Sequence, residues 1–314
     1  MDQPVVEVQE RPANVFHDVA SPPEKVASTA ALAARAVSPQ ACSTCGTAPP
    51  ANGGVVTPPS WVYALGSIVA RFPSISVEKE FAQATSREKT AGLTDRQALH
   101  TVLTKPENRY LVKQLCFVLT IEGLETYLLR PRDPADFSLL VEAIRPNPSP
   151  LDLDVVIGLK GPIAPPEMCN GLMVPIAVFD QIYSFDRKTL IESIPRAGKG
   201  SKGKEFDDAA DELFDRIMQM TDNAGSTDEH RALNYLVVRY QAIYTKAAEY
   251  FAQNCSLTAV DVHGSALSGV RKVLEVIFCY TNRNTDVVDK CFVRVDVTDE
   301  FPFLVTKLSP YYDR

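Results

Sequence analysis

Residues Asp154–Asp186 read DVVIGLKGPIAPPEMCNGLMVPIAVFDQIYSFD, and the interpretation of the whole chain starts from them. Two apolar runs, Val155–Leu159 and Leu172–Tyr183, enclose a segment of Gly, Pro, Glu, Cys and Asn. Runs of Val and Ile bounded by Gly and Pro are typical of buried strands. The sequence therefore predicts that the loop Gly161–Gly171 leaves the centre of a sheet, which holds it in place while its side chains stay free to bind or react.

The composition limits the class of protein. A chain of 314 residues with 45% hydrophobic residues can form one large globular unit or two small ones. Its net charge of -7 argues against a nucleic-acid partner, and no apolar run approaches the ~18 residues of a membrane span. The first residues lack the basic and apolar regions of a secretory signal. We therefore expect a cytoplasmic protein in which cysteines such as Cys116 and Cys279 are reduced and buried.

Residues 1–60 differ in composition from the rest, and we expect them to form a disordered tail rich in Pro and Ala. Cys42 and Cys45, followed by Gly46, form half of a zinc knuckle. A structural zinc needs four ligands, so the other two would come from distant residues or from a second subunit. The alternative is a pair of ordinary thiols in a linker. Residues 61–314 are predicted to form a single α+β domain.

The globular part begins with strand-like residues at Trp61 and then mixes helix and strand patterns. Cys116–Arg130 is predicted to form a hairpin around Glu122-Gly123, because two β-rich runs flank a turn. Thr94 and Asp133 are expected to cap short helices.

Two amphipathic helices are expected next. Phe206–Met220 places its apolar residues on one helical face, and Ser226-x-x-Glu229 has the spacing of a capping box that opens a second helix. We expect the two helices to form an antiparallel pair. The preceding RAGKGSKGKE fits the start of a phosphate-binding loop, but Glu205 stands where Ser or Thr should hold magnesium, and no strand precedes it. It is therefore interpreted as a solvated basic loop.

The last third is β-rich. Leu257–Val262, Lys272–Tyr280 and Lys290–Val297 predict a three-strand meander whose middle strand is central. The apolar C-terminal end should dock onto the body. The fold class is thus α+β, with a mixed or antiparallel sheet, this meander and the helix pair. One face of the last strand, with Phe292, Arg294 and Asp296, is expected to be free and able to pair with a peptide strand.

No metalloprotease, nucleophile-elbow or dinucleotide-binding motif occurs in the sequence. The best candidate for a polar site is the cluster Asp228, Glu229, His230 and Arg231. It opens a predicted helix, where backbone N–H groups and the helix dipole favour an anion. A carboxylate-binding site is the functional interpretation. A helix cap with a solvated first turn is the alternative.

The loop between the two central strands offers a second set of candidates. Glu167, Cys169 and Asn170 place a thiol, a carboxylate and an amide close together. A nucleophilic Cys169 would need a base or a lowered pKa, and the sequence shows neither. These residues are therefore candidates for binding, with no catalytic residue assigned.

Several strings resemble one family. They are YALGSIVARFPSISVEKEFAQ, NRYLVKQLCFVLTIEGLETYLL, GPIAPPEMCNGLMVP, FDQIYSFD, TDEHRALNYLVVRY and EFPFLVTKLSPYYDR. They are similar to the C-terminal domain of the cyanobactin maturation proteases of the PatA/PatG type, and the likeness runs from Trp61 to Arg314. In those proteins the domain, whose own role is unassigned, follows a subtilisin-like protease. None of that protease's Asp, His or Ser motifs is present to carry over, so the resemblance implies no peptidase activity here.

The resemblance implies a role in the maturation of a ribosomally made, modified peptide. We expect a non-catalytic accessory module that recognises the precursor peptide or holds its modifying enzymes or protease together, with a homodimer as one option. The alternative is an enzyme of unknown type that acts on such a peptide through Cys169, His230 or both.

Overall fold

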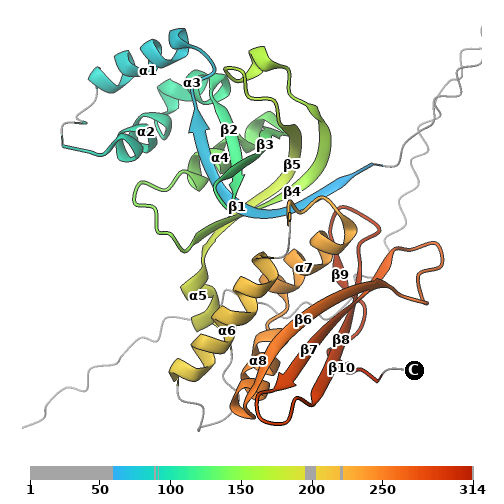
Figure 1. The fold of residues 1–314 in the computed structure, drawn as a ribbon. Coiled ribbons are helices and arrows are strands. Elements are labelled where there is room, and N and C mark those ends of the chain that lie inside the picture. The colour runs from blue at the N-terminus through green and yellow to red at the C-terminus, as the bar shows by residue number, and fades with distance from the viewer. Residues whose placement is uncertain (1–58, 88–89, 91, 195–202, 220–221, 313–314) are drawn as a thin grey trace, which may run out of the picture. The chain divides into compact units, whose positions relative to one another are not determined.

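The computed structural model describes residues 59–87, 90, 92–194, 203–219 and 222–312 (Figure 1). The described residues belong to a compact unit, Val56–Arg314. It is an α+β structure that holds a closed barrel and an antiparallel sheet. The predicted tail, with Cys42 and Cys45, and the start of the basic loop at Gly198 lie outside the described residues. Within the described part of the chain, no helix is both long and apolar enough to cross a membrane.

The barrel has five strands in the order β1-β2-β3-β5-β4, and β4 closes it by pairing with β1. The β3–β5 pair is parallel and the other pairs are antiparallel. Glu122 and Gly123 have positive φ at the β2–β3 turn, as the predicted hairpin requires. OB-folds are also five-stranded barrels, so this barrel is of the same general class. The strands are β1 (Trp61–Arg71), β2 (Cys116–Ile121), β3 (Leu124–Pro131), β4 (Asp152–Ile163) and β5 (Pro175–Asp186).

Two insertions add helices to the barrel. Helices α1 (Ile75–Arg87), α2 (Asp95–Leu103) and α3 (Arg109–Gln114) lie between β1 and β2, and α4 (Phe137–Ala143) lies between β3 and β4. The predicted caps are confirmed, because the Thr94 side chain accepts from the Gln97 N–H and the Asp133 side chain from the Ala135 N–H.

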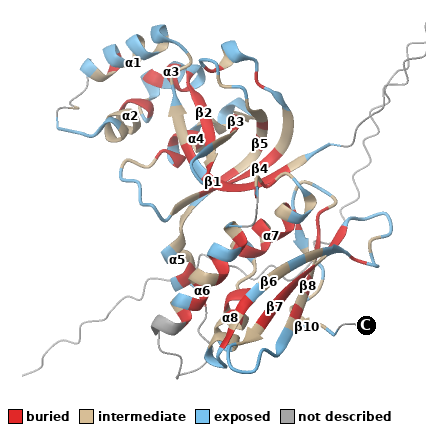
Figure 2. Ribbon diagram, viewed as in Figure 1, coloured by how far each residue is buried: buried red, intermediate tan, exposed pale blue. Residues whose placement is uncertain are grey.

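Most of β1 and β2 and the middle of β4 are buried on both faces, which explains their nearly continuous apolar sequences (Figure 2). On β1, Val62 and Ala64 belong to the core of the barrel and its helices, whereas Tyr63 and Leu65 pack with the C-terminal helices and sheet. On β2, alternate residues such as Val118 pack against the β4–β5 loop. Because successive side chains point to opposite faces, one strand serves two clusters.

The described residues of the C-terminal part form four helices and a second sheet. The predicted second helix of the pair is split in two, because Tyr240 leaves the helical conformation with ψ 84°. Strand β7 lies between β6 and β8, as predicted for the central strand. The elements are α5 (Arg187–Glu192), α6 (Gly203–Met218), α7 (Asp228–Arg239), α8 (Ala242–Ala252), β6 (Cys255–Gly264), β7 (Val273–Asn282), β8 (Val288–Asp296), β9 (Phe303–Leu304) and β10 (Ser309–Pro310).

The expectation of a free strand at Phe292, Arg294 and Asp296 is wrong. The C-terminal segment pairs with β8 on the side away from β7, through Phe303 opposite Asp296 and Ser309 opposite Phe292. This pairing satisfies backbone groups that would otherwise be left open, and it docks the apolar chain end as predicted. Among the long strands of this sheet in the described structure, β6 is left with a neighbour on one side only, whereas the short strands β9 and β10 each pair with β8 alone.

The segment between α6 and α7 joins the two parts of the unit. The Tyr63 N–H on β1 donates to the Gly225 carbonyl over 2.8 Å, and the Asn234 side chain on α7 donates to the Tyr63 carbonyl over 2.8 Å. Asn223 and Asn234 exchange two further hydrogen bonds. Gly225 has φ +69°, and a Cβ there would lie 2.4 Å from the Tyr63 oxygen, so this contact depends on glycine.

Candidate functional site

The β4–β5 loop, predicted as a functional loop, folds back onto the barrel. The 3-10 turn Pro166–Met168 is followed by Cys169, which is only 2% exposed, whereas Glu167 and Asn170 are exposed. The positive φ of Asn170 lets the loop turn sharply after Cys169. Two of the three candidates in this loop therefore face solvent, and their binding role stays a prediction.

Cys169 forms a disulfide with Cys116 at the start of β2. The expectation of a reduced Cys116 is wrong, whereas Cys279 is buried and forms no disulfide, as expected. The loop brings the two sulfurs together because it covers Val118 and Leu128 on the outer face of β2 and β3. A nucleophile must be a thiolate that the substrate can reach, and a buried sulfur in a disulfide is neither. In this state Cys169 has no such chemistry.

The start of α7 carries the other candidates. The Thr227 side chain accepts from the His230 N–H over 3.2 Å, so Thr227 is the N-cap and the predicted capping box at Ser226 and Glu229 is wrong by one residue. Thr227 has the extended backbone that an N-cap needs. Asp228 forms ion pairs with Lys272 at 2.9 Å and with Arg231 at 3.2 Å.

Arg231 is held by the chain itself. It is 1% exposed and donates to the carbonyls of Val297 over 2.9 Å, Asp299, and Glu300 over 3.2 Å. Burial lowers the pKa of its guanidinium, although Asp228 opposes this. These contacts tie α7 to the loop after β8. Of the guanidinium nitrogens, only Nε has no hydrogen-bond partner in the described structure.

His230 is half-buried, and its Nδ1 has no hydrogen-bond partner among the described residues. Burial lowers the pKa of the imidazole, and the nearby Glu229 and Asp222 only partly offset that effect. The ring is therefore neutral at pH 7. The first turn of α7 brings together the four candidates Asp228, Glu229, His230 and Arg231. The candidates of the β4–β5 loop are not part of this group, because that loop packs on β2 and β3 of the barrel. Their binding role also stays a prediction.

A carboxyl pair that the sequence did not indicate lies where β5 meets the loop after β8. Arg132 pairs with Asp180 at 2.7 Å and lies 3.9 Å from Glu300. Burial and the neighbouring Asp180 raise the pKa of Glu300 to about 7. The residues come from three distant parts of the sequence, so no local spacing could have predicted the cluster.

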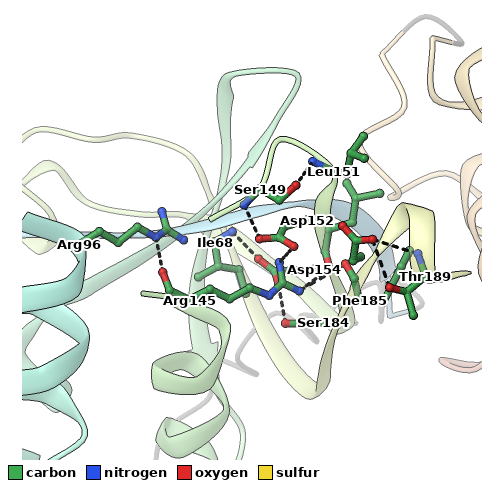
Figure 3. A network of polar contacts seen from close by, with 12 residues as sticks. Ile68, Arg96, Arg145, Ser149, Leu151, Asp152, Asp154, Ser184, Phe185 and Thr189 are labelled. Carbon is green, nitrogen blue, oxygen red and sulfur yellow. Dashed lines mark hydrogen bonds and ion pairs between the residues drawn. The ribbon is translucent and has the colours of Figure 1, made fainter. Parts of the chain in front are cut away.

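A second polar network surrounds Arg145, just after α4 (Figure 3). Its guanidinium lies 3.1 Å from Asp152, and its carbonyl accepts from the Arg96 Nε over 2.8 Å. The buried Asp154 accepts from the Ile68 N–H over 2.8 Å and from the Ser184 hydroxyl over 2.5 Å. Burial raises the pKa of Asp154, while these donors oppose the shift. The network fixes α2 and the ends of β4 and β5 relative to β1.

The same region borders a cavity of about 700 Å³, which we call the α1–α2 groove. Its walls are α1, α2 and the end of β1. A smaller cavity of about 370 Å³ lies between the β2–β3 turn and the α6–α7 connection. The α1–α2 groove is lined by Val69, Ala70, Phe72, Glu78, Phe81, Ala82, Thr85, Ser86, Asp95, Arg96, Ala98, Leu99 and Ile144.

The unpaired side of β6, which we call the β6 edge, presents free backbone groups. The Ser265 N–H donates to the Val273 carbonyl over 2.8 Å, and hydrogen-bonded pairs alternate with non-bonded pairs along an antiparallel ladder. Val260, Val262 and Gly264 fall in non-bonded pairs, so their N–H and C=O groups point away from β7. In the described structure no hydrogen bond takes up these groups.

In the part of the chain that the structure describes, no three His, Cys, Asp or Glu side chains lie together in a way that would hold a metal ion. Cys42 and Cys45 lie outside it, so the zinc knuckle stays a prediction.

Comparison with known proteins agrees with the resemblance in the sequence. Residues 61–270 match the family described as PatG Domain. A solved structure described as "PatG Domain of Unknown Function" matches with a TM-score of 0.64 and 18% identity, over 80% of this chain and 98% of that chain. At this identity the likeness shows the fold alone. No curated protein matches. Because the family match spans more than half of the chain, the protein belongs to the PatG domain family.

Proposed function

We propose that this protein is a non-catalytic peptide-recognition module that acts in the maturation of a ribosomally made, cyanobactin-like peptide. Membership of the PatG domain family supports the setting. The β6 edge is the observation that carries peptide binding, because it offers outward backbone groups at Val260, Val262 and Gly264 on a strand with one neighbour.

Strand addition suits a substrate that varies in side chains. An extended peptide that pairs with the β6 edge gains main-chain hydrogen bonds whatever its sequence, and alternate side chains can then set specificity. Arg216 already donates to the Thr258 carbonyl over 2.9 Å, so the start of the edge is occupied. We infer that a peptide pairs with the part of β6 that follows the irregularity between Leu257 and Ala259.

The test is calorimetric titration with the precursor peptide encoded beside this gene, and Val262→Pro is the informative variant. Proline removes the outward N–H at an edge position, where the ring is tolerated. We expect the substitution to weaken binding at least fivefold, whereas Val262→Thr, which keeps the N–H, should bind as the native protein does. Equal binding by both variants would show that the β6 edge is not used.

Mass spectrometry of the same mixtures separates recognition from catalysis. An unchanged peptide mass agrees with the proposal. A new mass would show an enzyme, and His230→Ala would then be the first variant to assay.

The same edge could pair with a second copy of this chain. Sedimentation of the native protein and of Val262→Pro over a range of concentrations distinguishes the two uses. A dimer that dissociates in the variant would assign the β6 edge to self-association, whereas a monomer in both leaves it to a peptide.

A further inference from the structure

We propose that the α1–α2 groove binds a peptide segment that carries both apolar and cationic side chains. The inference rests on the proposed function in taking the ligand to be a peptide, but it adds a second contact surface, in the barrel part of the unit.

The floor of the groove is apolar. The rings of Phe72 and Phe81 lie 5.3 Å apart, and both side chains, with that of Leu99, are partly buried against the core of the barrel and its helices. A volume of about 700 Å³ lies within the ~300–1,000 Å³ of typical ligand sites. Apolar side chains placed there would remove further apolar surface from water, which favours binding.

The rim of the groove is acidic. Glu78 lies in the first turn of α1 and Asp95 opens α2, and both are exposed. Within the described residues, neither carboxylate forms an ion pair. The Thr85 and Ser86 hydroxyls donate to carbonyls of their own helix over 3.0 and 2.8 Å, which leaves their oxygens as acceptors. These groups suit an ammonium or guanidinium group.

Arg96, the basic residue among the described lining residues, is already engaged. The Arg96 Nε donates to the Arg145 carbonyl, and Figure 3 shows the side chain directed into the Arg145 network. Its charge is one of those that lower the pKa of the buried Asp154. The groups left for a ligand are thus two carboxylates above an apolar floor, a combination complementary to an apolar, cationic peptide.

The experiment measures fluorescence anisotropy of a short labelled peptide of leucine and lysine, titrated with the full chain. Two comparison peptides replace lysine by glutamate or leucine by serine. The first variant, Glu78→Gln with Asp95→Asn, removes the rim charge. The second, Ala82→Trp, fills the groove from an exposed position on α1. The matched control, Glu107→Gln with Glu142→Gln, removes the same charge from exposed positions outside the groove.

We expect the native protein and the matched control to bind the leucine–lysine peptide equally, and each groove variant to bind it about tenfold more weakly. Both comparison peptides should bind more weakly than the probe. Absence of binding by the native protein, an equal loss in the matched control, or equal binding of the glutamate peptide would overturn the proposal. Val262→Pro should leave this binding unchanged, so failure at the groove and failure at the β6 edge are distinguishable.

Discussion

In the barrel every strand has a neighbour on both sides, whereas in the C-terminal sheet the long strand β6 has a neighbour on one side only. The outer faces of β1 and β2 are also covered, by C-terminal helices over β1 and by the β4–β5 loop over β2. In OB-type barrels the β2–β3 face and the adjoining loops bind ligands, but here the loop and the Cys116–Cys169 disulfide occupy that face. Fold class alone therefore does not locate a binding surface.

The largest effect on stability is expected at the contact between the barrel and the C-terminal part. Gly225→Val puts a Cβ against the Tyr63 carbonyl and forces a branched residue into φ +69°. We expect a loss of more than about 3 kcal/mol in the free energy of unfolding, measured by urea denaturation.

Gly264→Val is the matched control for that substitution. Gly264 lies at the end of β6, its φ is not positive, and a Cβ there meets nothing within 4 Å. The control should change stability by less than about 0.5 kcal/mol. Equal losses in the two variants would mean that the Gly225 contact does not hold the regions together.

The Cys116–Cys169 disulfide crosslinks the barrel and does not involve the C-terminal sheet. Cys116→Ala with Cys169→Ala removes a crosslink between residues 53 positions apart, in the barrel alone. We expect a loss of about 2–4 kcal/mol in the free energy of unfolding, because the unfolded chain regains conformational freedom. A dithiol reductant should produce a similar loss in the native protein and none in the double variant.

Much of the local structure of both regions could be predicted from the sequence, and the features that were missed have a common physical cause. Local patterns identified the β2–β3 hairpin, the central position of β7 and the Thr94 cap, because each depends on residues close in sequence. Barrel closure, the disulfide and the carboxyl pair depend on strand partners far apart, which apolar periodicity does not specify. The same limit explains why β8 was expected to be free.

For the candidate site, the sequence could name reactive residue types but could not place them. Nothing local distinguishes Cys169 from a free thiol, or shows that Arg231 is bound by carbonyls beyond residue 296. The α1–α2 groove was not predicted, since its walls come from α1, α2 and β1 together. Exposed Glu78 and Asp95 near Phe72 and Phe81 were the available signal, and surface charge on a helix is too common to be informative alone.

The Asp180–Glu300 pair makes the contact between the regions depend on pH. Because the pKa of Glu300 is about 7 in the folded protein and near 4.5 when unfolded, the folded state holds more protons between these values. The free energy of unfolding should therefore be highest below about pH 4.5 with respect to this group, and should fall as the pH rises through 7. After allowance for partial exposure, we expect a loss on the order of 1–2 kcal/mol.

Glu300→Gln tests that pH dependence, since glutamine resembles the protonated acid. The stability difference between pH 5 and pH 8, measured by urea denaturation, should be smaller in the variant than in the native protein. An unchanged difference would show that Glu300 does not titrate in this range.

The smallest expected effect concerns α7, which packs between β1 and β7 and so touches both regions. Thr227→Ala removes the side-chain acceptor for the His230 N–H and should cost about 1 kcal/mol in thermal or urea unfolding. Glu229→Ala, which would be equally harmful if the capping box began at Ser226, should cost less than about 0.5 kcal/mol, because the exposed Glu229 caps nothing. The reverse order would move the start of α7 by one residue, and with it the side chains that α7 directs toward the barrel and toward the sheet.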